Sequence, residues 1–149
     1  MTQSGASRAA DIKARAIAAG FDAVGIVRAD AIPEAPARLR EFLDRGRHGE
    51  MSWMEPRANE RGDPRALWRD ARTIIMTGLN YGPDDDPLRV LTKKSGGAIS
   101  VYARHRDYHD VVKKKLKALA GAIGRDFACE VKIFVDTAPV MEKPLAAAA

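Results

Sequence analysis

Cysteine is nearly absent from this sequence: Cys129 is the only one among 149 residues. A single cysteine excludes an internal disulfide, is typical of a reducing compartment, and by itself cannot hold a zinc ion or an iron–sulfur cluster. Residues 1–7 show no basic segment followed by an apolar core, and no run approaches the roughly 18 apolar residues of a membrane span. We therefore expect a cytoplasmic protein that does not enter a membrane.

Several catalytic and nucleotide-binding motifs are also missing. Residues 88–97 contain neither a Walker loop nor G-x-G-x-x-G, and no serine stands in a G-x-S-x-G elbow. His105 and His109 share an i, i+4 spacing without the other residues of H-E-x-x-H, so no metal site is predicted. The run from Asp107 to His109 begins like the corrinoid-binding signature, but Val112 stands where its glycine should follow, and we reject that assignment.

The composition is that of a folded domain with a basic surface. Hydrophobic residues make up 46% of the chain, beside only 12 glycines and 8 prolines, which is enough for a buried core. The 25 basic residues exceed the 20 acidic ones, giving a net charge of +5. Six basic and two acidic residues fall within 104–117, so any preference for a polyanion is concentrated there.

Hydrophobic periodicity predicts helices alternating with short strands. Gly20 is placed to end the first helix, and Asp63 with Pro64 to begin the third. We predict an α/β (α+β) fold with a mixed sheet and flanking helices. The helices are expected at 7–19, 33–45, 63–68, 108–123 and from 137 onward, and the strands at 21–27, 73–81, 99–103 and 130–136.

Two features have more than one interpretation. Residues 48–55 hold two methionines and Trp53 without a clear period, which fits a packed lid, a plug in the core, or a contact surface for a large flat ligand or a partner. Lys115 falls inside the apolar arc of helix 108–123. Its ammonium group is expected to extend to water, pair with an acid, or point into a cavity.

The segment 130–144 is the main candidate for chemistry. Its alternating residues predict a strand that ends at Asp136, and Thr137 with Pro139 can begin a helix directly after it. A carboxylate at such a junction serves either as a catalytic group or simply as a stabilising charge at a helix N-terminus. We expect general acid chemistry from Asp136 if the segment 108–115 meets it at one sheet edge, with Lys143 close by.

Five stretches of this sequence resemble the N-terminal domain of epoxyqueuosine reductases, and the similarity spans nearly the whole chain. The resemblance implies a nitroreductase-like, cobalamin-binding fold in a cobalamin-dependent, iron–sulfur enzyme. Members of that family reduce the epoxide of epoxyqueuosine to queuosine in the tRNA anticodon loop. The stretches are 21–26, 63–68, 78–81, 107–109 and 134–146.

The resemblance also implies residue roles. Asp136 would be the proton donor to the epoxide oxygen, which requires burial to raise its pKa, and Lys143 would lie near the tRNA backbone. Arg104 and Arg106 are candidates for phosphate or corrin side-chain contacts. We assign cofactor binding to Tyr108, His109, Arg104 and Lys115, tRNA binding to Lys143 and Arg106, and no residue to a metal.

The sequence differs from this family in one important respect. Family members continue into a ferredoxin-like module whose cysteines hold two clusters, and those cysteines are absent here. Residues 145–149 look like an unfinished helix, so we expect the 149 residues to be the N-terminal domain of a longer protein and inactive alone. Expected partners are the tRNA anticodon stem-loop and an external electron donor that acts through the absent module. The protein is expected to be a monomer. The alternative is a non-catalytic RNA-binding or cobalamin-handling module, in which Asp136 only caps a helix.

Overall fold

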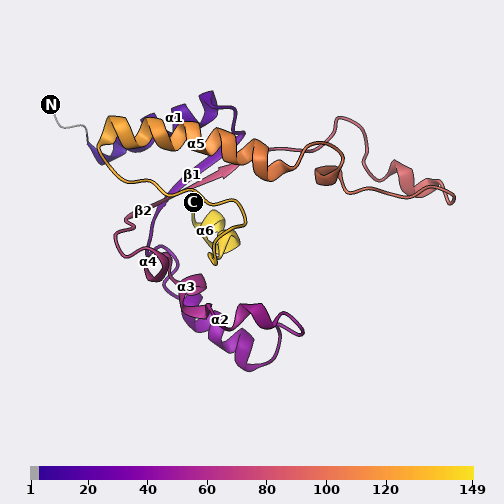
Figure 1. Cartoon of the computed structure of the whole chain (residues 1–149), viewed down its shortest axis with the longest axis horizontal. Helices are drawn as coiled ribbons and strands as arrows, with labels where there is room; N and C mark the ends of the chain where they lie inside the picture. Colours follow the sequence, from indigo (N-terminus) through magenta and orange to yellow (C-terminus); the bar gives the residue numbers. More distant parts are fainter. Residues whose placement is uncertain (1–3) are drawn as a thin grey trace. The chain divides into compact units, whose positions relative to one another are not determined.

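The computed structural model describes residues 4–149, which fall into two compact units (Figure 1). The first unit combines the chain up to Ala23 with Gly78–Val135, and the second combines Val24–Thr77 with Asp136–Ala149. Each unit is therefore built from two stretches that are distant in the sequence. Residues 1–3, the first part of the segment 1–7 considered in the sequence analysis, lie outside the described range.

Two helices form the body of the first unit. The helix α1 (Gly5–Ala18) lies beside α5 (Tyr108–Phe127), as Figure 1 shows. Arg15 joins them by pairing with Asp126 of α5 and, at 2.9 Å, with Asp11 of its own helix. Both predicted helices are confirmed, and α5 extends four residues beyond its predicted end. The buried apolar residues of this unit include Ala16, Phe21, Leu119 and Ile123.

Lys115 closes the C-terminal end of α1. Its ammonium group donates to the carbonyls of Ala19 (3.0 Å) and Gly20 (3.1 Å) and lies 6.0 Å from the centre of the Phe21 ring. A cation at the last carbonyls of a helix complements the helix dipole. Gly20 has a φ of 83°, which confirms its predicted role as the residue that ends this helix.

The sheet has two strands within residues 4–149, β1 (Ala23–Arg28) and β2 (Thr73–Gly78). Asp22 N–H donates to the Gly78 carbonyl (2.9 Å) and Ala29 N–H to the Arg72 carbonyl (3.0 Å), so the strands run antiparallel. The Asp22 carboxylate also accepts from the backbone N–H of Asn80 (2.7 Å). Both strands were predicted within one or two residues at their N-terminal ends.

Short helices and one core cluster make up the rest of the second unit. Asp63 caps α4 by accepting from Arg65 N–H (2.9 Å), with Pro64 at the first position, which confirms the predicted helix start. Fully buried Leu145 packs with Ile32 and Ala35. The elements are α2 (Ala35–Asp44), the 3₁₀ turn η1 (Ser52–Met54), α3 (Ala58–Gly62), α4 (Pro64–Leu67) and α6 (Glu142–Ala148).

Two predicted strands are wrong, and with them the four-stranded mixed sheet. Residues 99–103 contain the 3₁₀ turn η3 (Val101–Ala103), and a second such turn, η2 (Arg89–Thr92), precedes it. Residues 130–136 show the predicted alternation, with odd positions less exposed than even ones, yet form no strand. Strands need a hydrogen-bonded neighbour, and neither segment has one in the described part of the chain. The last helix begins at Glu142, later than predicted.

Candidate functional site

Asp136 adopts an unusual backbone conformation. Its φ is 51°, in the left-handed region that residues other than glycine seldom enter and that aspartate tolerates better than most. The residue is exposed and stands in a bend between the extended segment before it and α6. A strained conformation that the surrounding chain maintains is frequent at functional sites. The predicted strand end is thus replaced by a left-handed bend, which still fixes the direction of the side chain.

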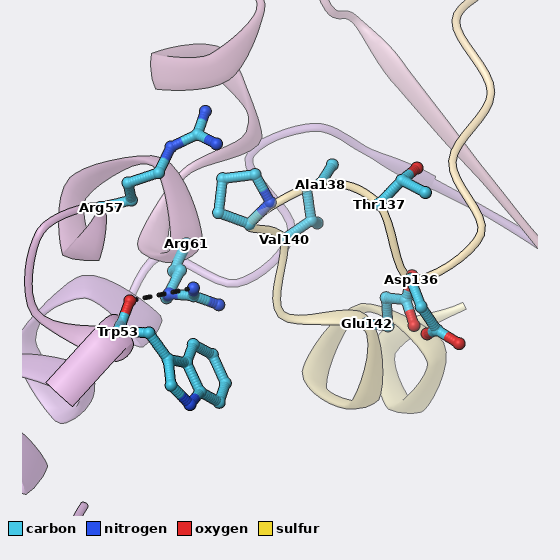
Figure 2. Close-up of a pocket in the computed structure, with 9 residues that line it drawn as sticks. Trp53, Arg57, Arg61, Asp136, Thr137, Ala138, Val140 and Glu142 are labelled. Carbon is cyan, nitrogen blue, oxygen red and sulfur yellow. Dashed lines mark hydrogen bonds between the residues drawn. The ribbon is translucent and has the colours of Figure 1, made fainter. Parts of the chain in front are cut away.

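A cavity of about 380 Å³ opens beside this bend, within the second unit. In Figure 2, Asp136 and Glu142 lie on one side of it, while Trp53 and Arg61 lie across from them. Pro139 is buried within the connecting segment. The cavity thus combines residues from two stretches separated by more than seventy positions. Its lining residues are Trp53, Arg57, Arg61, Asp136, Thr137, Ala138, Pro139, Val140 and Glu142.

On the acidic side of the cavity, Glu142 has a raised pKa. Desolvation of its carboxyl group raises its pKa most, and the nearby charge and hydrogen-bonding contact of the Asp136 carboxyl raise it further. A hydrogen bond from the Asp136 backbone N–H acts in the opposite direction. The residue as a whole stays exposed, so the desolvation concerns the carboxyl end. Glu142 therefore retains a proton to a higher pH than an ordinary glutamate.

The opposite side of the cavity is cationic and aromatic. The Arg61 guanidinium lies 4.6 Å from the centre of the Trp53 ring, and its Nη2 donates to the Trp53 carbonyl (3.4 Å). Arg57 pairs with Glu60 along α3. Among the described residues the buried Arg61 Nε has no hydrogen-bond partner. An anionic or flat aromatic ligand would find complementary groups on this side, and the carboxyl groups of Asp136 and Glu142 on the other.

The predicted residues Tyr108 and His109 begin α5 in the first unit. Their rings stack with centres 4.0 Å apart, and His109 Nδ1 lies 2.7 Å from the Asp107 carboxylate. Asp107 also caps the helix by accepting from His109 N–H (2.9 Å). That backbone bond, followed by the ring contact, lowers the pKa of Asp107. The proximity of this cluster to Asp136 stays a prediction.

The remaining predicted residues are also placed. Arg104 Nε donates to the Ile99 carbonyl (3.1 Å), and Lys115 caps α1 as described. Arg106 and Lys143 are exposed. Lys143 follows Glu142 in the first turn of α6 and is not among the residues that line the cavity. Of the predicted site residues, the cavity therefore contains Asp136 alone, and the assigned roles of the others stay predictions.

Sequence reasoning did not assign to the site the four other charged or aromatic residues that line the cavity. Glu142 lies in the segment that was singled out, yet its contact with Asp136 depends on the bend at Asp136 and not on strand geometry. Trp53 belongs to the segment with several interpretations. Arg57 and Arg61 have an i, i+4 spacing that places them on one helical face, and this spacing could have indicated a cationic wall beside Trp53.

The described residues include no set of protein ligands for an iron–sulfur cluster. Over residues 4–149 no group of three or more metal-ligating side chains occurs, and Cys129 is exposed and free. The side chains predicted for the corrin, Arg104, His109 and Lys115, each bond to protein atoms of their own unit. We therefore derive no step through either group. None of the described helices is long and apolar enough to cross a membrane.

Comparison with known proteins relates this chain to one family. Residues 61–137, just over half of the chain, match the family model for "Epoxyqueuosine reductase QueG, DUF1730", which ends one residue beyond Asp136. An epoxyqueuosine reductase of Gloeobacter violaceus is 43% identical over 148 residues, covering 97% of this chain and 44% of that protein. That of Escherichia coli is 34% identical over 137 residues, covering 91% of this chain and 36% of the relative.

A solved structure agrees with these matches. The epoxyqueuosine reductase of Streptococcus thermophilus superposes with a TM-score of 0.69 at 27% identity, over 89% of this chain and 36% of that one. The chain thus spans about two fifths of the length of the relatives it matches. The matched segment includes Arg61 and Asp136, and the fold of the chain matches a solved member of the same family. The chain belongs to the epoxyqueuosine reductase family.

Proposed function

We propose that the protein acts in tRNA queuosine biosynthesis as the substrate-binding part of an epoxyqueuosine reductase, with Asp136 as proton donor. The observation that supports this most directly is the position of Asp136: a residue in the left-handed region that lines a cavity and contacts a second carboxyl group. It falls inside the segment that matches the family model. The substrate would be the epoxide-bearing wobble base of a tRNA anticodon loop.

The reaction needs protons that this cavity can deliver. Conversion of an epoxide to an alkene and water takes up two electrons and two protons, and the oxygen must be protonated to leave. A positioned general acid transfers its proton to the leaving oxygen in the transition state. In our proposal Asp136 donates to the oxygen, while Glu142, with its raised pKa, holds a proton in reserve beside it.

The electrons would come from groups that this chain does not itself ligate. Bound to the intact gene product, cobalamin would supply these two electrons, which an external donor would provide through an iron–sulfur module. The 149 residues contain one cysteine, so they do not provide the cluster ligands. The activity is accordingly proposed for the intact gene product and not for these residues alone.

Basic residues on both units support an RNA substrate. Lys143 lies on the exposed side of α6, and the run 104–117 carries six basic and two acidic residues. Phosphate contacts of this kind hold a stem-loop without reading its sequence, and an unpaired loop base can then enter a cavity. The proposed contacts of Arg106 and Lys143 are with tRNA phosphates.

One assay tests the proposal. The intact gene product, reconstituted with cobalamin and iron–sulfur clusters and given a chemical reductant, is incubated with tRNA that contains epoxyqueuosine. We expect nucleoside mass spectrometry to show loss of one oxygen and formation of queuosine, and no conversion without cobalamin. Tight tRNA binding with no conversion under these conditions would instead support the non-catalytic RNA-binding module.

A further inference from the structure

We propose that Trp53 and Arg61 form a stacking platform for the planar base that carries the reactive epoxide. The platform lies across the cavity from Asp136 and Glu142 in Figure 2. This inference rests on the proposed function, because it takes the ligand to be the epoxide-bearing base. The epoxide is on a substituent of that base, so the flat ring lies away from the proton donor when the epoxide is next to it. It assigns a role to Trp53, whose segment had no settled interpretation from sequence.

The geometry of Trp53 is that of a supported but accessible ring. Arg61 lies over the ring at 4.6 Å and also donates to the Trp53 carbonyl (3.4 Å), so one residue fixes both the ring and its backbone. Trp53 is nevertheless 58% exposed. A large aromatic side chain held in place yet left open to solvent is typical of a surface that binds a ligand.

The chemistry of this wall suits a base of single-stranded RNA. Unpaired bases stack on aromatic rings and on the planes of arginine guanidinium groups, and positive charge nearby favours the attached phosphates. Arg57, which is paired with Glu60, adds a second guanidinium group to the same wall. The Arg61 Nε, buried and without a hydrogen-bond partner among the described residues, keeps one donor unused.

The size of the cavity favours a base over a corrin. Its volume of about 380 Å³ lies in the range of pockets for small ligands. A purine-like base with one ring substituent fits such a volume, whereas a corrin macrocycle with its side chains is far larger. The same cavity joins the platform to the carboxyl pair, so one nucleotide can contact both.

A thermodynamic cycle tests the platform. Binding of two anticodon stem-loops to the intact gene product is measured by fluorescence anisotropy, one with a purine at the wobble position and one with an abasic nucleotide there. We expect Trp53→Ala to weaken binding of the purine stem-loop about tenfold, which corresponds to the usual contribution of one stacked base. It should leave binding of the abasic stem-loop unchanged. Trp53→Phe keeps a ring and should retain most of the affinity.

The control variants separate stacking from general effects. Tyr81→Ala removes an aromatic residue that is 67% exposed and does not line the cavity, and it should weaken both stem-loops equally or not at all. Arg61→Lys keeps the charge but loses the guanidinium plane, and it should show part of the Trp53→Ala effect on the purine stem-loop only. Circular dichroism melting confirms that each variant is folded.

Two results would overturn the inference. One is an equal loss of affinity for the purine and abasic stem-loops in Trp53→Ala. The other is an unchanged affinity for both stem-loops. Weaker cobalamin binding by the same variant, measured by absorbance, would then assign the platform to the corrin. The proposed function is judged separately. If the wild-type protein converts epoxyqueuosine but Trp53→Ala does not weaken the purine stem-loop more than the abasic one, the platform alone is rejected. If Trp53→Ala has this purine-specific effect but the wild-type protein converts no epoxyqueuosine, the function alone is rejected.

Discussion

Glu142, the first residue of α6, places its carboxyl group against that of Asp136 and accepts a hydrogen bond from the Asp136 backbone N–H. The left-handed φ of 51° at Asp136 brings these groups together over six residues of chain. Two carboxyl groups in contact cannot both ionise freely, and desolvation adds to this effect at Glu142. Glu142 therefore stores a proton on one side of the cavity.

The raised pKa of Glu142 predicts a specific pH dependence of stability. The folded state binds the Glu142 proton more tightly than the unfolded state, so this contribution is fully present below the unfolded pKa. It is lost as the pH rises through the higher folded pKa. We expect the free energy of unfolding of wild type minus that of Glu142→Gln to fall with pH across that window, as measured by urea unfolding.

The difference in the free energy of unfolding between wild type and Glu142→Gln cancels the contributions of carboxylates whose pKa is lowered in the folded state. Arg28 lowers the pKa of Asp30 to about 2, so that group stabilises the fold above its unfolded pKa in both proteins. A difference that stays flat from pH 4 to pH 8 would show that Glu142 has no raised pKa.

The backbone of Asp136 predicts opposite effects of two substitutions. Asp136→Gly removes the cost of the left-handed conformation and should stabilise the protein by about 1 kcal/mol, while Asp136→Ala should destabilise it by roughly as much. Ala128, with a φ of 48° at the end of α5, provides the matched control outside the cavity. Ala128→Gly should stabilise by a similar amount, and if neither glycine variant raises the urea midpoint, the strain is absent.

The cap that Lys115 forms on α1 predicts a structural loss. Lys115→Met keeps most of the apolar stem but cannot donate to the carbonyls of Ala19 and Gly20, and we expect a loss of about 1–2 kcal/mol in urea unfolding. The control is Lys114→Met, because Lys114 is the exposed neighbour of Lys115 on the same helix and caps no helix within residues 4–149. Equal stability of the two variants would argue against the cap and leave Lys115 available for the predicted cofactor contact.

The predicted phosphate contact of Lys143 is tested by salt. Neutralising one phosphate contributes about one unit to the slope of log K against log salt concentration, so Lys143→Ala should lower that slope by about one. Lys143→Arg should retain it. The exposed Lys13 on α1 provides the control, and a slope unchanged by Lys143→Ala would remove this residue from the RNA surface.

The sequence predicted the helices well because their signals are local. Gly20 and Asp63 act within a few residues of their own positions, so these two signals located an end of α1 and of α4, and apolar periodicity located α5. The segment 130–136 was misjudged because alternating exposure occurs in any extended chain, and only a neighbouring strand makes it part of a sheet. That neighbour is not encoded in the segment itself.

The cavity could be predicted only in part for a related reason. Asp136 stands out by its local context, but its contacts depend on a left-handed φ that no residue preference requires. Trp53 and Arg61 reach the cavity from more than seventy residues away, through the packing of the second unit. Their positions follow from the tertiary structure, not from the pattern of the sequence around them.

The most direct test of the central claim is the rate of epoxide reduction by Asp136→Asn in the reconstituted intact gene product. We predict that kcat falls by about 10²–10⁴-fold, the usual contribution of a general acid, while tRNA affinity changes little. The matched control is Asp84→Asn in the exposed acidic loop, which should leave the rate unchanged. If Asp136→Asn reduces the epoxide as fast as Asp84→Asn, then Asp136 is not the proton donor.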